Sequence, residues 1–379
     1  MYARMRFDHV RIDDRPPCGR LGFCLTPDLT GNGRPDILVG GMGRAYPMTV
    51  GRKRIKLRQL PVAGPVIKRR EWNVFWYENP GWERHDVART PDLSVGGSLG
   101  DLDGDGLPEL IVGENNGSNL FWFDPPADPR DPWERHLITD AFQKYHDTLV
   151  TDVDGDGEPE VLLLSQHSRV VCYYDIPEEP RQSPWPSSMR ETIADGLDVE
   201  GVGVSDLDKD GQVEVIAGPN VFSRNAEGWT RHAFADWEWT RIALGDLDGD
   251  GREEIVISEG DLPYQGDRPG QLGIVDPETW SVTVLEDELF CPHTLQIGDV
   301  TGNGRPDILV GEMGIQRHPD PALYLYCNDG DGGFDRVEID RGIGTHEAKL
   351  VDLTGDGRLD IASKSYGPPA HVDVWLQRE

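Results

Sequence analysis

The sequence predicts an all-β protein, a seven-bladed β-propeller with four strands per blade, in a single domain that covers residues 1–379. Three observations support this fold class. An acidic nonapeptide recurs seven times, short β-branched runs flank each copy, and the two ends of the chain supply strands that complete one blade. From Asp28 in the first copy to Asp352 in the last, six intervals average 54 residues. Repeats of about this length, built from short strands, are typical of propellers.

Each copy of the nonapeptide begins with Asp and ends with Asp or Glu. The copies are DLTGNGRPD from Asp28, DLDGDGLPE from Asp101, DVDGDGEPE from Asp152, DLDKDGQVE from Asp206, DLDGDGREE from Asp246, DVTGNGRPD from Asp299 and DLTGDGRLD from Asp352. An apolar stretch such as TLVTDV or RIALGDL leads into the acidic segment, and a run such as ILVG or VIAG follows it. Each copy is therefore expected to join the first and second strands of a blade.

The third and fourth strands of each unit follow in order. NVFWY at residues 73–77 and LFWF at residues 120–123 are typical third strands. A fourth strand is predicted where an aromatic residue opens a run of the kind WERHDVA. These runs begin at Trp82, Trp133, Trp229, Trp280 and Phe334.

The seventh unit ends after its third strand, HVDVWLQRE, and has no fourth. FDHVRID at Phe7–Asp13 reads like the fourth strand FDRVEID of the sixth unit and has no strands of its own before it. We predict that this N-terminal strand completes blade seven, since pairing removes an exposed sheet edge and closes the ring.

The acidic loops resemble those of FG-GAP/VCBS-type repeats, which form the blades of integrin α-subunit heads and of many bacterial carbohydrate-active and adhesive proteins. The resemblance covers almost the entire chain and implies the fold more than the function, because one fold hosts many functions. The overall pattern is also similar to the propeller of aldos-2-ulose dehydratases and, more distantly, to propeller polysaccharide lyases. These enzymes eliminate water or a sugar leaving group beside a carbonyl or carboxylate.

The composition excludes several classes of protein. The chain has 68 Asp and Glu against 37 Lys and Arg, a net charge of −31, so binding of nucleic acid through its phosphates would be repulsive. No apolar run is long enough for a membrane helix. The five cysteines form no CxxC pair, which argues against a disulfide framework and a structural zinc site. The chain is cytoplasmic if Met1 is native, and otherwise a secreted or periplasmic mature form.

Copies two to five of the nonapeptide are expected to bind calcium. Each has Asp at positions 1, 3 and 5 and an acid at position 9, which places several hard oxygen ligands on one tight loop. The expected ligands are Asp101, Asp103, Asp105, Glu109, Asp152, Asp154, Asp156, Glu160, Asp206, Asp208, Asp210, Glu214, Asp246, Asp248, Asp250 and Glu254. The other three copies carry Thr or Asn at these positions and should bind more weakly or be held by hydrogen bonds alone. The alternative for every copy is an Asx-rich turn without an ion.

Function is expected where the repeats differ. The residue six before each loop's first Asp lies at the start of the innermost strand, so these positions form a ring at one mouth of the channel. They are Gly22, Val95, His146, Glu200, Thr240, His293 and His346. Three histidines in one register predict a site for zinc or manganese, because imidazole is a common ligand of catalytic divalent metals. The alternative is three histidines that bond independently to water or backbone.

Further candidates are expected around this mouth. The three ring histidines and the nearby Tyr145 and Tyr366 are candidate catalytic groups. The candidate substrate-binding residues are Glu200, Arg241, His167, Lys364 and Arg317. A mixture of acid, base and aromatic groups in a concave funnel suits a polyhydroxylated ligand.

An insertion in blade one, residues 41–71, is strongly basic. It carries nine Lys and Arg against the single acid Glu71, and the alternating run VGRKRIKLRQL is typical of a hairpin arm. The arm could attract an anionic ligand such as a uronate, or form a contact between subunits of a homo-oligomer.

Three functions remain open from the sequence. The favoured one is a carbohydrate-active lyase or dehydratase that performs metal-assisted β-elimination on a sugar or uronate. The alternatives are a non-catalytic glycan- or protein-binding propeller of integrin-like type, and a scaffold without a small-molecule site. The histidine ring favours the enzyme, since binding through loops does not require three histidines in one register.

Overall fold

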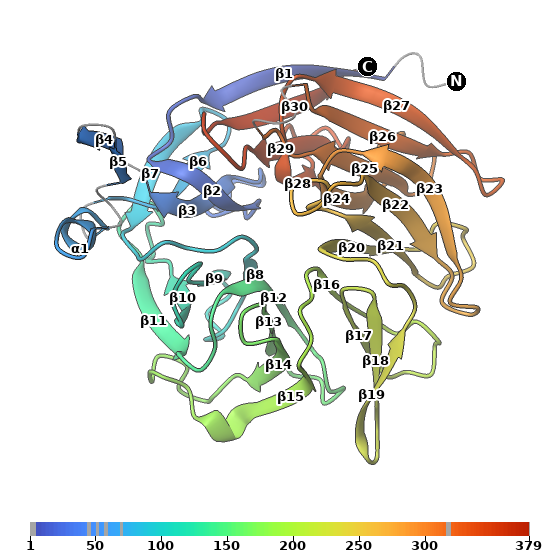
Figure 1. Cartoon of the computed structure of the whole chain (residues 1–379), viewed down its shortest axis with the longest axis horizontal. Coiled ribbons are helices and arrows are strands. Elements are labelled where there is room, and N and C mark those ends of the chain that lie inside the picture. Colours follow the sequence, from blue (N-terminus) through green and yellow to red (C-terminus); the bar gives the residue numbers. More distant parts are fainter. Residues whose placement is uncertain are drawn as a thin grey trace.

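The computed structural model describes residues 5–43, 47–50, 53–56, 60–68, 71–315 and 320–378. Seven four-stranded antiparallel sheets are arranged as blades around a central axis (Figure 1). This confirms the predicted all-β, seven-bladed propeller. Among the described residues, no helix is long and apolar enough to cross a membrane.

The strands of the first four blades run outward from the axis in chain order. Blade one contains β2 (Cys18–Leu25), β3 (Ile37–Gly43), β6 (Val74–Glu78) and β7 (Glu83–Ala88). Blade two contains β8 (Ser98–Gly100), β9 (Glu109–Gly113), β10 (Leu120–Asp124) and β11 (Glu134–Thr139). Blade three contains β12 (Tyr145–Thr151), β13 (Glu160–Ser165), β14 (Val170–Asp175) and β15 (Arg190–Asp195). Blade four contains β16 (Val202–Ser205), β17 (Glu214–Ala217), β18 (Asn220–Asn225) and β19 (Gly228–Ala233).

The last three blades follow the same pattern. Blade five contains β20 (Thr240–Gly245), β21 (Glu254–Glu259), β22 (Gly270–Val275) and β23 (Val282–Leu289). Blade six contains β24 (Pro292–Gly298), β25 (Asp307–Glu312), β26 (Ala322–Asn328) and β27 (Phe334–Arg341). Blade seven contains β28 (His346–Val351), β29 (Asp360–Lys364), β30 (Val372–Arg378) and, outermost, β1 (Arg6–Asp13).

The ring closes as predicted, because β1 pairs antiparallel with β30 from the other end of the chain. His9 Nε2 and Arg11 Nε both lie within hydrogen-bond distance of Asp373 Oδ1, at 2.8 and 2.9 Å. Asp373 is 1% exposed. The closing strand is therefore fixed by a buried carboxylate as well as by its backbone ladder.

The core lies between neighbouring blades. One buried cluster combines Phe23 and Trp76 of blade one with Phe123 and Trp133 of blade two. Another combines residues of blades one and seven across the closure, including Leu21 and Val374. Burial of such large apolar side chains favours the folded state, so each blade is stabilised by its neighbours.

The basic insertion forms a hairpin of β4 (Pro47–Val50) and β5 (Lys53–Lys56), followed by α1 (Ala63–Lys68). These elements project outward beside blade one, away from the centre of the ring (Figure 1).

Candidate functional site

Three of the innermost strands carry a β-bulge where a ring histidine is located. The pairing of β12 with β13 shifts between Tyr145 and Asp147, and that of β24 with β25 shifts between Pro292 and Thr294. In blade seven the register shifts directly after His346. Bulges redirect side chains and are frequent beside active sites. Here the bulges place residues from three blades at the same mouth of the channel.

His146 is oriented by the residue that follows it. Its Nδ1 lies 2.8 Å from Asp147 Oδ2, and Asp147 in turn accepts a hydrogen bond of 3.0 Å from the backbone N–H of Gly201. With the proton on Nδ1, the free Nε2 lies 3.5 Å from Glu200 Oε2. A carboxylate that fixes the far nitrogen of a histidine is the usual outer-shell arrangement of metal sites.

Close backbone packing supports His146 from blade two. Gly96 adopts a left-handed conformation with φ +68, and a Cβ atom at this position would lie 2.1 Å from the carbonyl oxygen of His146. Only glycine fits such an approach.

His293 lies between two carboxylates. Its Nδ1 is 3.5 Å from Glu347 Oε1, and its Nε2 is 4.0 Å from Asp261 Oδ1. Its ring stacks on that of His346 with the centroids 3.8 Å apart. Glu347 itself has φ +59, an uncommon backbone conformation for a residue with a side chain. The surrounding fold therefore holds this carboxylate in place at a cost in free energy.

The ligand atoms of these residues are spaced for a metal ion. Those of His146, Glu200 and His293 lie within 4.8 Å of one another, and so do those of His293, His346 and Glu347. Two ligands of a tetrahedral zinc ion are about 3.3 Å apart, given bonds of about 2.0 to 2.1 Å. Two of the buried atoms, Glu200 Oε2 and His293 Nδ1, have no hydrogen-bond partner within the described part of the chain. The donor set therefore fits a divalent transition metal.

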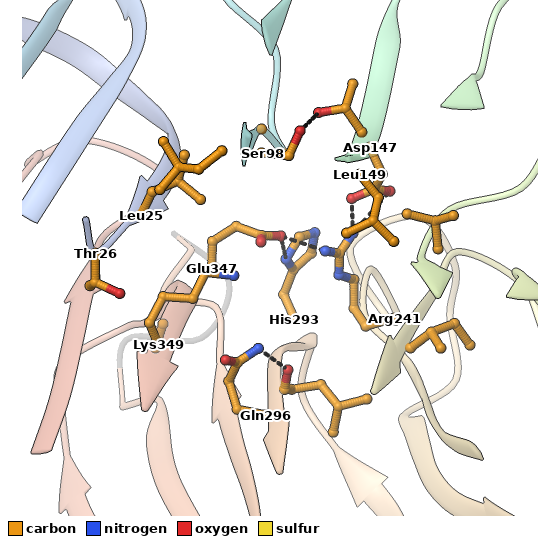
Figure 2. Close-up of a pocket in the computed structure, with 18 residues that line it drawn as sticks. Leu25, Thr26, Ser98, Asp147, Leu149, Arg241, His293, Gln296, Glu347 and Lys349 are labelled. Carbon is orange, nitrogen blue, oxygen red and sulfur yellow. Dashed lines mark hydrogen bonds and ion pairs between the residues drawn. The ribbon is translucent and has the colours of Figure 1, made fainter. Parts of the chain in front are cut away.

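Arg241 links the carboxylates of Asp147 and Glu347, which come from blades three and seven (Figure 2). Its guanidinium lies 3.2 Å from Asp147 Oδ1 and 2.8 Å from Glu347 Oε1. Burial opposes the ionised form of Asp147, but Arg241 and His146 outweigh it and hold its pKa below the usual value. Arg241 also lines a cavity of about 390 Å³ in the channel, whose walls include Ser98 and Gln296.

The protonation states of the histidines differ because their neighbours differ. Burial disfavours the charged form of His146, but the Glu200 and Asp147 carboxylates raise its pKa. Burial lowers the pKa of His293, and Arg241 lowers it further. Burial, His293 and Lys364 lower the pKa of His346. Both stacked histidines are therefore neutral and able to accept a metal or a proton.

Two predicted site residues have other positions than expected. Tyr145 is 1% exposed and its hydroxyl donates to the carbonyl of Ser118 at 3.0 Å, so it belongs to the core between blades and cannot act as a base at the mouth. Lys364 is fully buried and donates to the carbonyls of Leu21 and Gly22 at 3.0 and 2.6 Å.

Lys364 also contacts His346 Nδ1. Burial lowers the pKa of Lys364 to about 7. The Lys364 amine is already bonded to two backbone carbonyls and to His346, so it is not free to contact a substrate. We therefore regard Lys364 as a positioning residue for His346.

The remaining predicted residues are placed as follows. Tyr366 stacks on His346 with the centroids 4.7 Å apart, and burial raises its pKa. Glu200 and Arg241 belong to the cluster described above. His167 is exposed in the turn between β13 and β14, and Arg317 lies outside the described residues.

Sequence reasoning missed four contributors, Asp147, Glu347, Asp261 and Arg20. The first two directly follow ring histidines, and the dipeptides His-Asp at residue 146 and His-Glu at residue 346 were a readable signal. Asp261 and Arg20 reach the mouth from a loop and from β2, and no local pattern marks them.

The acidic loops lie at the other ends of the innermost strands. In blade two, one oxygen each of Asp101, Asp103, Asp105 and Glu109 lies within 4.8 Å of the others. Asp152, Asp154 and Glu160 of blade three form a similar group, as do Asp206, Asp208 and Asp210 of blade four.

The acid at position 9 of each of these loops binds the backbone at position 2. Each glutamate accepts a hydrogen bond from a backbone N–H group. The pairs are Glu109 with Leu102, Glu160 with Val153, Glu214 with Leu207 and Glu254 with Leu247. Burial raises the pKa of Glu109 to about 8, and the neighbouring Asp103 raises it too. The raised pKa means that the ionised form of Glu109 is poorly stabilised when the loop holds no cation.

Amides replace carboxylates in the loops of blades one and six. The side-chain amide of Asn32 donates to the carbonyl of Asn79 at 3.0 Å, and that of Asn303 to the carbonyl of Asn328 at 3.4 Å. Asn328 Nδ2 also reaches the carbonyl of Leu247 in blade five, at 2.7 Å. These loops are held by hydrogen bonds that extend to the neighbouring blade.

Comparisons with known proteins agree with this architecture. The FG-GAP-like repeat family matches residues 101–163 and 294–363. No curated protein matches the chain.

Similar solved structures include an ancestral GH74 enzyme, with a TM-score of 0.57 and 10% identity over 94% of this chain and 56% of that one. A chain from a mitotic checkpoint complex has a TM-score of 0.55 and 10% identity over 98% of this chain and 95% of that one. The extracellular domain of a one-component system from B. thetaiotaomicron has a TM-score of 0.53 and 12% identity over 97% of this chain and 39% of that one. The chain thus spans little more than half of the GH74 enzyme and less than half of the extracellular domain.

Likenesses at these identities show the fold alone. Together with the seven observed blades, they identify the chain as a seven-bladed β-propeller in which residues 101–163 and 294–363 match FG-GAP-like repeats.

Proposed function

We propose that the chain is a carbohydrate-active lyase or dehydratase that holds zinc or manganese at the channel mouth and performs β-elimination on a sugar or uronate. The observation that carries the proposal is the buried cluster of His146, Glu200 and His293, with two polar atoms that have no hydrogen-bond partner among the residues that the structure describes. Buried polar groups are normally paired, so such atoms point to a missing ligand.

The ion would be held by His146, Glu200 and His293. When bound, it supplies Lewis-acid stabilisation of the negative charge that develops on the substrate oxygen beside the carbon that loses its proton. Imidazole nitrogen mixed with carboxylate oxygen favours zinc or manganese over calcium. Asp147 keeps the proton on His146 Nδ1 and so leaves Nε2 free as a ligand.

The proton transfers fall to His346 and Tyr366. His346 is neutral and stacked beside the cluster, which makes it the base that takes the proton from the carbon. The electron pair of that C–H bond forms the new double bond while the C–O bond at the next carbon breaks. Burial raises the pKa of Tyr366, so its hydroxyl stays protonated and can give a proton to the leaving oxygen.

Calcium is proposed for the acidic loops of blades two to five. Their ligands are all oxygen atoms, which calcium prefers. These loops and the channel cluster should therefore hold different metals in the same molecule.

The test combines elemental analysis with an assay for the product. Protein washed with calcium should retain about one zinc or manganese ion per chain, and uronate-containing polysaccharides should give a product with the ultraviolet absorbance of a conjugated double bond. His293→Ala should lose both, whereas His232→Ala, in the exposed outer strand β19, should keep both. Retention of metal without any elimination would favour the glycan-binding alternative, and absence of a transition metal from the parent would overturn the proposal.

A further inference from the structure

A second cavity, of about 610 Å³, opens beside the histidine cluster. Its walls include Arg20, Tyr264, Tyr366 and His371, together with glycines and prolines of the surrounding loops. Tyr366 belongs to both regions, because it lines this cavity and stacks on His346. The volume lies in the range of small-molecule sites, which is about 300 to 1,000 Å³.

The charge of this cavity is opposite to that of the chain. The whole chain has a net charge of −31, yet no Asp or Glu is among the described residues that line the cavity. Arg11, Arg20 and His371 line it instead. A local positive site in so acidic a protein attracts anions selectively.

Arg20 is the free cation of this site. Its guanidinium lies 5.0 Å from the centre of the Tyr366 ring, and within the described ranges no carboxylate approaches it closely enough for an ion pair. Arg11 differs, because its Nε is bound to Asp373 at 2.9 Å. A guanidinium placed over an aromatic ring is preorganised to bind a carboxylate through two parallel hydrogen bonds.

His371 and the two tyrosines complete a surface for a sugar ring. His371 Nδ1 is bound to Asp373, which leaves Nε2 available to a ligand hydroxyl. Tyr264 is 39% exposed and offers an accessible aromatic side chain. The ends of the loop from Ser365 to His371 are joined by two hydrogen bonds of 3.0 Å, from the Ser365 N–H to the His371 carbonyl and from the His371 N–H to Ser365 Oγ, so this wall of the cavity is preformed.

We propose that this cavity binds a uronate, with the sugar's carboxylate on Arg20 and its ring between Tyr264 and His371. The inference rests on the proposed function and narrows its substrate class to acidic sugars. Among the described residues of the cavity wall, Arg20 is an arginine without a carboxylate partner, which matches the single negative charge of a uronate. A carboxylate also acidifies the C–H bond on the adjacent carbon, which is the bond that the proposed elimination breaks.

Binding can be tested without any reaction. The full chain is titrated with glucuronate, galacturonate and mannuronate, with the matching neutral hexoses, and with the hexose 6-phosphates, by calorimetry or ligand-observed NMR. At least one uronate should bind tenfold or more tightly than its neutral partner and more tightly than its phosphate partner. Equal binding of acidic and neutral sugars, or a preference for the phosphate, would overturn the inference.

Arg20→Gln should remove the preference for the uronate. Arg34→Gln, a substitution of an exposed arginine in the acidic loop of blade one, is the matched control and should keep it. Tyr366→Phe should also keep it, because the ring under Arg20 is retained. An unchanged preference in Arg20→Gln would contradict the inference, provided that its melting temperature equals that of the parent.

The two proposals can fail separately. The titrations are repeated in chelator and with His293→Ala, where the uronate preference should persist because Arg20 is not part of the metal cluster. Persistence without elimination activity would refute the proposed function and leave the acidic-sugar site standing. Elimination that depends on His293 but not on Arg20 would support the proposed function and refute the acidic-sugar site.

Discussion

The two ends of the innermost strands differ in how they balance charge. At one end the acidic loops place several carboxylates on a few residues, and single arginines reach some of them, such as Arg181 of the loop after β14 to Asp103 and Arg224 of β18 to Asp154. At the other end Asp147 and Glu347 share Arg241 and each contacts a histidine. Most carboxylates of the loops thus have no arginine partner among the described residues, whereas the carboxylates at the mouth are paired by side chains of the chain itself.

The difference separates structure from function. The loops repeat in every blade, and their bonds run to backbone groups of the same loop or the next blade. The histidine cluster occurs once and combines side chains from several blades. Positions that repeat are explained by the needs of a blade, and those that depart from the repeat identify the site.

The largest effect is expected from a change that should disturb both ends together. Deletion of residues 1–13 removes β1 and leaves β30 with an unpaired edge and Asp373 without His9 and Arg11. The melting temperature should fall by roughly 10 °C or more, since each kcal/mol lost shifts it by about 2 to 4 °C in a domain of this order. Deletion of residues 1–4 alone keeps β1 and is the control, so this chain should melt at a higher temperature than the longer truncation. Equal melting of the two truncated chains would show that the closure contributes nothing.

Calcium should stabilise the loop end alone. Each occupied site contributes about 2.7 kcal/mol when free calcium exceeds its Kd a hundredfold, so melting measured in chelator and in calcium should differ by several degrees. The measurement is best made on His293→Ala, which lacks a proposed ligand at the channel mouth. Superimposable melting curves would show that Asx turns hold these loops without an ion.

Asp147→Asn should affect the mouth alone. Loss of an outer-shell carboxylate typically weakens a metal site by about 10- to 100-fold, so zinc affinity in a competition assay should fall by that factor while the calcium response of the loops is kept. Asp195→Asn, at the exposed end of β15, serves as the matched control. An unchanged zinc affinity would mean that His146 is not a ligand.

The smallest effect separates the two kinds of loop. Asn328→Ala removes the hydrogen bond to Leu247 and leaves that buried carbonyl unpaired, which should cost about 1 to 2 kcal/mol in denaturant unfolding. Asn225→Ala changes the equivalent, exposed last residue of the third strand in blade four and should cost less than half as much. Equal losses would contradict the view that the Asn328 amide stabilises the contact between blades five and six.

The fold could be predicted from the sequence because its information is local and repeated. Seven acidic loops in one register fix the blades, and the likeness of Phe7–Asp13 to the outer strand of blade six predicts the closure. The ring register likewise selected His146 and His293, whose ligand atoms lie near those of Glu200.

The contacts that decide the roles of single residues are not local. Tyr145 was expected at the mouth, but it packs in the core between blades, while the bulge that follows it brings both His146 and Asp147 to the channel. Lys364 binds carbonyls at Leu21 and Gly22, more than 340 positions away along the chain. No pattern near Lys364 could reveal that contact.

The pairing of β1 with β30 also constrains the order in which the protein can mature. His9 and Asp373 are 364 positions apart, so β1 is synthesised long before its partner β30 and stays unpaired until β30 is available. Contacts of such high sequence separation form late and slow the completion of a fold. Because His346 of blade seven stacks on His293 of blade six, the histidine cluster is complete only after blade seven has been synthesised. A chain that stops before blade seven would contain most of the blades but would lack both His346 and the partner of β1.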